Sequence, residues 1–204
     1  MIRPCRHPIC FVLISLVPSV LYLSSYATAA GPPTVLTFDD VSADTLNPVP
    51  IPPGYGGVNW AADMSIYGPS QPPYDPESSP NRILFGGTRF SYEESKVTFI
   101  GGPKIFDGAY FSGYSLVWFR LYVGGSLVAQ SPVLVLGDSV PGGGIGPTFL
   151  PSGYSGPVDQ VGIQGYRGFF VMDNFTFHEV PEPSSVFLCL AAIFATLMRR
   201  RNFR

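Results

Sequence analysis

The chain has 204 residues, of which 46% are hydrophobic and 13% charged, with 23 glycines, 22 prolines and 3 cysteines. Residues 31–180 carry six basic and thirteen acidic side chains, a charge of about −7, and contain none of the cysteines. An acidic segment without a basic cluster argues against nucleic acid as a partner, and the lack of cysteine excludes disulfide and thiolate chemistry there. The length favours a single domain.

Residues 1–29 have the pattern of a secretory signal peptide. Two arginines precede an apolar run at 9–23, and a stretch of small residues follows it. Ala27 and Ala29 match the small-x-small pattern that signal peptidase recognises, which predicts cleavage after Ala29 or Ala30. The run is interrupted and shorter than the about 20 apolar residues that cross a bilayer, so a retained anchor is the less favoured alternative. The pattern therefore predicts an exported protein.

Residues 30–179 have the pattern of an all-β domain. Short runs of β-branched and aromatic residues alternate with Gly and Pro, and no long segment shows a 3.6-residue apolar period. Eight strands are expected, at 34–39, 58–64, 82–85, 96–100, 115–123, 126–136, 158–164 and 169–178. Gly124 and Gly125 predict a hairpin between two of them. This arrangement predicts a β-sandwich, most simply a jelly roll.

Two long stretches inside this domain are expected to be loops. Residues 47–80 are rich in proline, and residues 137–156 are rich in glycine and proline. The run at 142–147 has the glycine content of a phosphate-binding loop. It lacks the Lys-Ser/Thr pair, however, and Pro147 stands where a helix would begin. We therefore expect surface loops without nucleotide binding.

Trp118, Arg120 and Tyr122 are expected on one face of the strand at 115–123, because side chains alternate along a strand. An aromatic-cation-aromatic row suits a sugar-binding platform, since the C–H faces of pyranose rings lie well on Trp and Tyr rings. The favoured alternative is that this face packs under a loop, with Arg120 stacked between rings. Trp60, in the first long loop, is a further candidate for ligand binding.

Asp173 is expected in the middle of an apolar stripe, because alternation places it on the same face of the last strand as Phe169 and Phe177. A buried carboxylate is costly without a partner. An arginine or backbone amides are the favoured partners. The alternative is a structural calcium ion held together with Asp39 or Asp40, since hard oxygen ligands suit Ca²⁺ and the extracellular medium supplies it. No other cofactor is indicated.

The residue types give little support for catalysis. His178 is the one histidine between residues 31 and 179, and it stands directly before the C-terminal tail, a poor position for a general base in a cleft. Acidic residues are plentiful, but no spacing singles out a carboxylate pair. We therefore predict no enzymatic activity, and a carboxylate-based extracellular hydrolase is the least favoured function.

Residues 180–204 form a tail of three parts. In chain order these are a short motif, an apolar run and a basic end, namely Val180, Pro181, Glu182 and Pro183, then residues 186–198, then Arg199, Arg200 and Arg201. An apolar stretch backed by arginines is a stop-transfer pattern. The run is about two-thirds of a normal span, which predicts a marginal or transient membrane segment. A buried C-terminal helix is the alternative.

This order of parts resembles the PEP-CTERM sorting signal. The resemblance implies recognition by an exosortase, which cuts near the Pro-Glu-Pro motif, and delivery to the cell surface or the extracellular matrix. The expected organisation is a signal peptide at 1–29, a β-sandwich domain at 30–179 and a sorting tail at 180–204. A signal helix and a C-terminal hydrophobic helix would then flank the sandwich.

The middle domain resembles galactose-binding-like jelly rolls. The likeness rests on the stretch at 36–40, the glycine-rich loop at 54–57 and the closing run at 171–175. It implies that the first and last strands lie together, where such domains often carry a structural calcium ion. We therefore expect a non-enzymatic surface or matrix protein with weak affinity for extracellular polysaccharide. A structural matrix component without a sugar site is the alternative.

Overall fold

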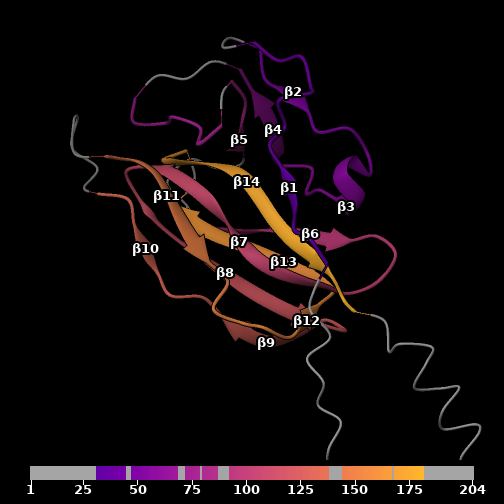
Figure 1. Cartoon of the computed structure of the whole chain (residues 1–204). Coiled ribbons are helices and arrows are strands. Elements are labelled where there is room, and N and C mark those ends of the chain that lie inside the picture. The colour runs from indigo at the N-terminus through magenta and orange to yellow at the C-terminus, as the bar shows by residue number, and fades with distance from the viewer. Residues whose placement is uncertain are drawn as a thin grey trace, which may run out of the picture.

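The computed structural model describes residues 31–44, 47–68, 72–78, 80–86, 92–137, 144–166 and 168–181. This part of the chain is all-β, with one short 3-10 helix, η2 (Tyr55–Gly57), and no α-helix. No helix in these ranges has the length and apolar character to cross a membrane. Two antiparallel sheets pack face to face (Figure 1), which confirms the predicted β-sandwich. The expected flanking helices lie outside the described residues.

Sheet A has eight strands, of which six form its main path. In spatial order these six are β11 (Ile145–Pro151), β7 (Lys104–Gly113), β14 (Phe170–Glu179), β5 (Arg82–Phe85), β4 (Met64–Tyr67) and β2 (Val49–Pro50). Two short strands complete it, with β1 (Thr34–Leu36) paired to β14 and β12 (Pro157–Val158) paired to β7. The first and last strands of the domain therefore lie together, as expected.

Sheet B has six strands, and the hairpin predicted at Gly124 and Gly125 lies within it. Five strands follow one path, namely β10 (Leu134–Val135), β8 (Leu116–Val123), β13 (Gln160–Tyr166), β6 (Tyr92–Phe99) and β3 (Val58–Asn59). The sixth, β9 (Ser126–Gln130), pairs with β8 after the turn. Strands β8, β13 and β6 are therefore direct neighbours.

The core between the sheets is built largely from phenylalanine rings. Phe119 of β8 meets Phe106 of β7 edge to face, with ring centroids 4.8 Å apart, and lies 5.5 Å from Phe111. Val117, Phe119 and Leu121 have no exposed surface, which confirms that this side of β8 belongs to the core. The domain is thus stabilised mainly by apolar burial.

Two long strands of sheet A were missed by sequence reasoning, as was the two-residue strand β2 inside the loop predicted at 47–80. β7 fell between expected strands, and β11 lies inside the segment predicted as a loop at 137–156. Glycines made β7 look unlike a strand. A Cβ on Gly108 would stand 2.2 Å from the carbonyl oxygen of Leu150, and one on Gly113 would stand 2.2 Å from that of Phe169. Glycine is thus needed where neighbouring backbone approaches closely.

Two expected strands are split instead of continuous. The segment at 58–64 divides into β3 of sheet B and β4 of sheet A. The segment at 126–136 divides into β9 and β10, and Ser131 between them donates its N–H to the carbonyl of Phe119 at 3.0 Å. Apolar content does not reveal such breaks, because the chain can end one strand and begin the next without a change in residue type.

The predicted apolar stripe along the last strand, with Phe169, Val171, Asp173, Phe175 and Phe177 on one face, is wrong, because only its second half lies in the core. Phe170, Met172, Phe175 and Phe177 belong to the core cluster, so the parity of core positions changes after Met172. The cause is a bulge, because the register with β7 shifts between Asp173 and Thr176 and Asn174 has a φ of 51°. A bulge inserts one extra residue and changes which face the following side chains occupy. Asp173 therefore does not share a face with the two phenylalanines that follow it.

Candidate functional site

The outer face of sheet B gathers charged and aromatic side chains. Cross-strand register places Gly162 of β13 opposite Lys96 of β6 and Arg120 of β8. Gln160 stands opposite Thr98 and Tyr122 in the next row. The residues between these positions point into the core. Because side chains alternate along a strand, the residues named here lie on the face turned away from the core.

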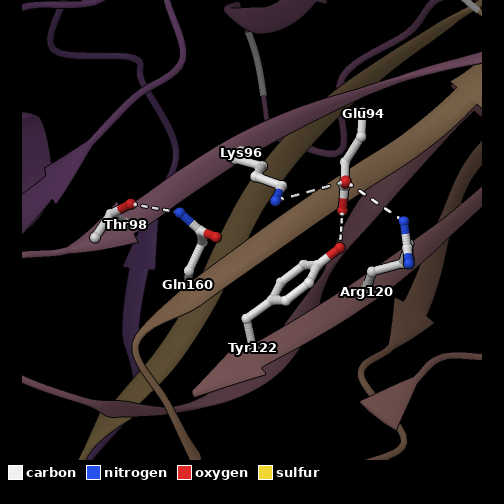
Figure 2. A network of polar contacts seen from close by, with 6 residues as sticks. All are labelled: Glu94, Lys96, Thr98, Arg120, Tyr122 and Gln160. Carbon is white, nitrogen blue, oxygen red and sulfur yellow. Dashed lines mark hydrogen bonds and ion pairs between the residues drawn. The ribbon is translucent and has the colours of Figure 1, made fainter. Parts of the chain in front are cut away.

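Glu94 is the centre of a polar cluster on this face (Figure 2), made of Glu94, Lys96, Arg120 and Tyr122. The Tyr122 hydroxyl donates a hydrogen bond of 2.6 Å to Glu94 Oε1. Glu94 Oε2 lies 3.5 Å from Arg120 Nη1 and 3.9 Å from Lys96 Nζ. Two cations thus share one carboxylate, which leaves one positive charge in excess for a ligand.

Tyr122 lies beneath Lys96 and Glu94 and does not offer its ring to a ligand. Its side chain is 5% exposed, and Lys96 Nζ lies 4.4 Å above its ring centroid. Burial, together with the hydrogen bond to Glu94, raises the pKa of Tyr122 to about 12. The phenol therefore stays protonated and holds the Glu94 carboxylate in place across the neutral pH range.

Gly162 leaves the space that Glu94 occupies. A Cβ at this position would stand 1.9 Å from Glu94 Oε1. Because Gly162 has no side chain, Glu94 can reach from β6 across β13 to Tyr122 on β8. The close approach explains a glycine in the middle of a central strand, where it otherwise weakens the sheet.

An aromatic strip adjoins the polar cluster and consists of Trp118, Tyr92, Tyr166 and Phe169. The ring centroids of Tyr92 and Trp118 lie 6.2 Å apart, and those of Tyr92 and Tyr166 lie 4.9 Å apart. Tyr166 stacks on Phe169 at 5.4 Å. Tyr92 is 54% exposed, so the strip offers an open ring surface to a ligand.

The structure places the predicted ligand-binding residues in two different settings. Trp118, Arg120 and Tyr122 do lie together on the outer face of sheet B, with Tyr122 covered. Trp60 is half-buried against the core, where its ring meets Phe38 and Phe175 at 5.3 Å. Its Nε1–H donates to the carbonyl oxygen of Tyr55. The structure therefore does not bring Trp60 to the face that holds Trp118.

Sequence reasoning missed Tyr92, Glu94 and Lys96. The expected strand began at residue 96, whereas β6 begins at Tyr92. A signal was present, because Tyr92, Glu94, Lys96 and Thr98 follow one another at every second residue. Two adjacent glutamates disguised it, since acidic residues are depleted in strands.

Asp173 finds its partners in hydrogen-bond donors, mostly backbone amides. Oδ2 accepts from the Ser78 N–H at 2.8 Å and the Ser78 hydroxyl at 3.2 Å, and Oδ1 accepts from the Asn174 N–H at 2.7 Å. Backbone amides, which were among the favoured partners, thus bind this carboxylate. Asp39 accepts from the Asn81 N–H and Asp40 from the Tyr55 hydroxyl. Among the described residues, no three His, Cys, Asp or Glu side chains gather as a metal site.

Replacing Asp173 by asparagine should remove a pH dependence of stability. Asp173 is 2% exposed, and burial raises its pKa to about 6 despite the hydrogen bonds. The unfolded pKa is about 3.9, so the folded state binds the proton more tightly. The free energy of unfolding of the wild type should therefore rise, relative to Asp173→Asn, by about 2–3 kcal/mol between pH 7 and pH 4.

Urea unfolding at a series of pH values measures this difference. If the free energy of unfolding of the wild type falls relative to that of Asp173→Asn as the pH is lowered to 4, the raised pKa of Asp173 is contradicted. Repeating the series with EDTA tests the calcium prediction, because a bound ion stabilises the folded state and its removal lowers the midpoint.

His178 is engaged at both ring nitrogens. Nε2 lies 2.8 Å from Asp107 Oδ2, and Nδ1 lies 2.6 Å from the carbonyl oxygen of Gly31. Burial raises the pKa of Asp107, and the contact with His178 opposes that rise. Both neighbours of the imidazole are acceptors, so neither nitrogen is placed to activate a nucleophile. The contact instead ties the end of β14 to the start of the described chain.

The processing signals fall mostly outside the described residues. Val180 and Pro181 directly follow β14, and Val180 is 37% exposed. The remaining predicted positions are not described, namely Glu182, Pro183, Arg199, Arg200 and Arg201 of the tail and Ala27, Ala29 and Ala30 of the signal peptide.

Solved structures with a similar β fold share little sequence with this chain. A DUF4465 family protein from Bacteroides caccae is 11% identical with a TM-score of 0.45, and the match covers 74% of this chain and all of that protein. The arabinose-bound MgGH51 α-L-arabinofuranosidase is 14% identical with a TM-score of 0.43, over 71% of this chain and 26% of the enzyme. A family 29 carbohydrate-binding module is 12% identical with a TM-score of 0.41, over 75% of this chain and 99% of the module. No protein-family model and no curated protein matches the sequence.

Proposed function

We propose that this protein is an exported, non-enzymatic protein of the cell surface or extracellular matrix that binds polysaccharide weakly through the outer face of sheet B. The observation that carries the proposal is the open aromatic strip beside the polar cluster. Tyr92 is 54% exposed, and the Arg120 and Lys96 side chains retain 33% and 45% of their exposure. Rings and charged groups are thus accessible side by side.

This combination suits the two chemical faces of a sugar ring. The C–H face of a pyranose packs on Tyr92 or Trp118, because aromatic rings bury apolar surface at little entropic cost. Sugar hydroxyls accept hydrogen bonds from Arg120 and Lys96, which already stand in fixed positions around Glu94. The face is a sheet surface and not an enclosed pocket, so it favours a stretch of polysaccharide and modest affinity.

The proposal includes a route to the cell surface. The signal peptide pattern at 1–29 and the PEP-CTERM-like tail at 180–204 support export, transient membrane insertion and cleavage by an exosortase. The pairing of β1 with β14 supports the finer assignment of the sandwich to galactose-binding-like jelly rolls. Intact mass of the surface-extracted protein should lack both end segments, whereas a chain still ending at Arg204 would mean a permanent anchor.

A glycan-array screen with matched variants tests the binding function. Tyr92→Ala and Trp118→Ala should each weaken binding about tenfold, because one aromatic contact contributes roughly 0.5–1.5 kcal/mol beyond its buried area. Phe149→Ala is the matched control, since Phe149 is 37% exposed on sheet A and should leave binding unchanged.

Three results would contradict this function. The first is the absence of binding to every glycan, which would favour a structural matrix component. The second is equal affinity of Tyr92→Ala, Trp118→Ala and wild type. The third is release of product from a polysaccharide, which would favour a hydrolase.

A further inference from the structure

A pocket of about 410 Å³ lies on sheet A, on the side away from the core. Tyr67 and Arg82 face each other across β4 and β5, and Leu84 faces Val171 across β5 and β14. Tyr74 and Phe169 supply two further aromatic walls from the segments at 72–78 and 168–169. The volume is in the range of sites that hold a small ligand.

Arg82 gives this pocket an unusual polar group. The residue is 5% exposed, and its Nη1–H donates to the carbonyl oxygen of Gly68. Its Nε–H is buried and has no hydrogen-bond partner in the part of the chain that the structure describes. The guanidinium lies 5.2 Å from the centroid of the Tyr67 ring. A buried donor without an acceptor costs free energy, so an acceptor bound in the pocket would recover it.

The charge around Arg82 favours a singly charged ligand. Arg82 is the one cation among the described residues that line the pocket. Burial lowers the pKa of Arg82, and the charges of Tyr67 and Asp75 oppose this fall, so the single positive charge of the pocket is partly offset. Among the described lining residues a dianion such as a phosphate ester would find no second cation, whereas a carboxylate matches the planar edge of one guanidinium.

We propose that this pocket binds a uronic acid unit, with the sugar carboxylate accepting from Arg82 Nε–H and the pyranose ring between the walls of Tyr67, Tyr74 and Phe169. The carboxylate satisfies the buried donor, and the aromatic walls take the C–H faces of the ring. The proposal is independent of the polar cluster, which lies on the other sheet.

The two surfaces nevertheless meet at one residue. Phe169 lines the pocket, and its ring stacks on Tyr166 of the aromatic strip at 5.4 Å and 27°. A polysaccharide that follows the strip past Tyr166 therefore reaches the mouth of the pocket. The bound polymer is then one that carries carboxylates, and the pocket selects the acidic unit.

A ¹⁵N-edited NMR titration that follows the Arg82 Nε–H resonance tests this site. The probes are D-galacturonate and D-glucuronate. The methyl ester of D-galacturonate and D-galactose are the neutral controls with the same ring size. We expect a downfield shift of the Arg82 Nε–H signal with the two uronates and at least tenfold weaker binding of the ester. Galactose 1-phosphate is the dianionic comparison and should bind more weakly than the uronates.

Two variants separate the pocket from the rest of the fold. Leu84→Trp fills the pocket and keeps the charge of Arg82, so uronate binding should be lost while the melting temperature stays close to that of the wild type. Arg82→Lys keeps the charge and loses the Nε–H, and it should weaken uronate binding at least tenfold. Trp118→Ala removes part of the aromatic strip and should leave binding of the monomeric uronates unchanged.

The outcomes distinguish this proposal from the proposed function. Equal binding of galacturonate and its methyl ester, wild-type affinity in Leu84→Trp, or tighter binding of the phosphate would overturn the uronate site. Loss of monomeric uronate binding in Trp118→Ala would also overturn it, because the ligand would then sit on sheet B. Failure of every polysaccharide to bind, with binding of the monomeric uronates intact, would overturn only the function assigned to the outer face of sheet B.

Discussion

Replacing Gly162 by alanine should weaken polysaccharide binding at least tenfold. The new Cβ would stand 1.9 Å from Glu94 Oε1, so the carboxylate must move away. Its hydrogen bond from Tyr122 and its ion pairs with Arg120 and Lys96 would then be broken. The group that moves is the far end of a flexible side chain, so the melting temperature should change much less than the affinity.

Two comparisons make this prediction specific. Gly146→Ala is the matched control, because a Cβ there would meet no atom within 4 Å, and it should change neither binding nor stability. In a Glu94→Ala background, Gly162→Ala should add little further loss, since the displaced group is already absent. Fully additive losses in the double variant would show that Gly162 acts by some route other than Glu94.

Replacing Phe175 by alanine should give the largest loss of stability, about 3–5 kcal/mol in the free energy of unfolding. Phe175 has no exposed surface. Its ring lies 4.7 Å from that of Phe106 and 5.3 Å from that of Trp60, so truncation leaves a cavity lined by other aromatic rings. Urea unfolding, with the midpoint and slope fitted separately, measures the effect.

A graded series checks that the loss comes from packing. Phe175→Leu should lie between the wild type and Phe175→Ala, because leucine fills part of the cavity. Phe149→Ala removes a ring that is 37% exposed and should cost much less. Equal losses in Phe149→Ala and Phe175→Ala would mean that burial in the core does not determine the stability of this domain.

The sequence was most informative where apolar side chains recur at every second residue of a strand. Alternation along β8 predicted both the core row at Val117, Phe119 and Leu121 and the outer position of Trp118. Alternation failed along β14, because Asn174 adopts a left-handed conformation and shifts the register. Asparagine tolerates that conformation, but an asparagine within a strand is not enough to predict a bulge.

The candidate sites depend on contacts that no single segment reveals. Glu94 reaches Tyr122 only because Gly162 lies between them, and these residues come from three strands. The pocket likewise joins Tyr67, Arg82 and Phe169, which become neighbours through the order of strands in sheet A. Residue types indicated aromatic and acidic character, but strand order and register decided which side chains meet.

The position of β14 has a mechanical consequence for a protein held at a surface by its C-terminal side. Residue 181 continues directly from this ten-residue strand, so a pull on the tail enters the sandwich along β14 itself. β14 lies inside sheet A, with β7 along one side and β1 and β5 along the other. Force along its axis loads these ladders together in shear, and they cannot open one bond at a time. A C-terminal attachment of the kind proposed above would therefore load the strand best placed to carry tension.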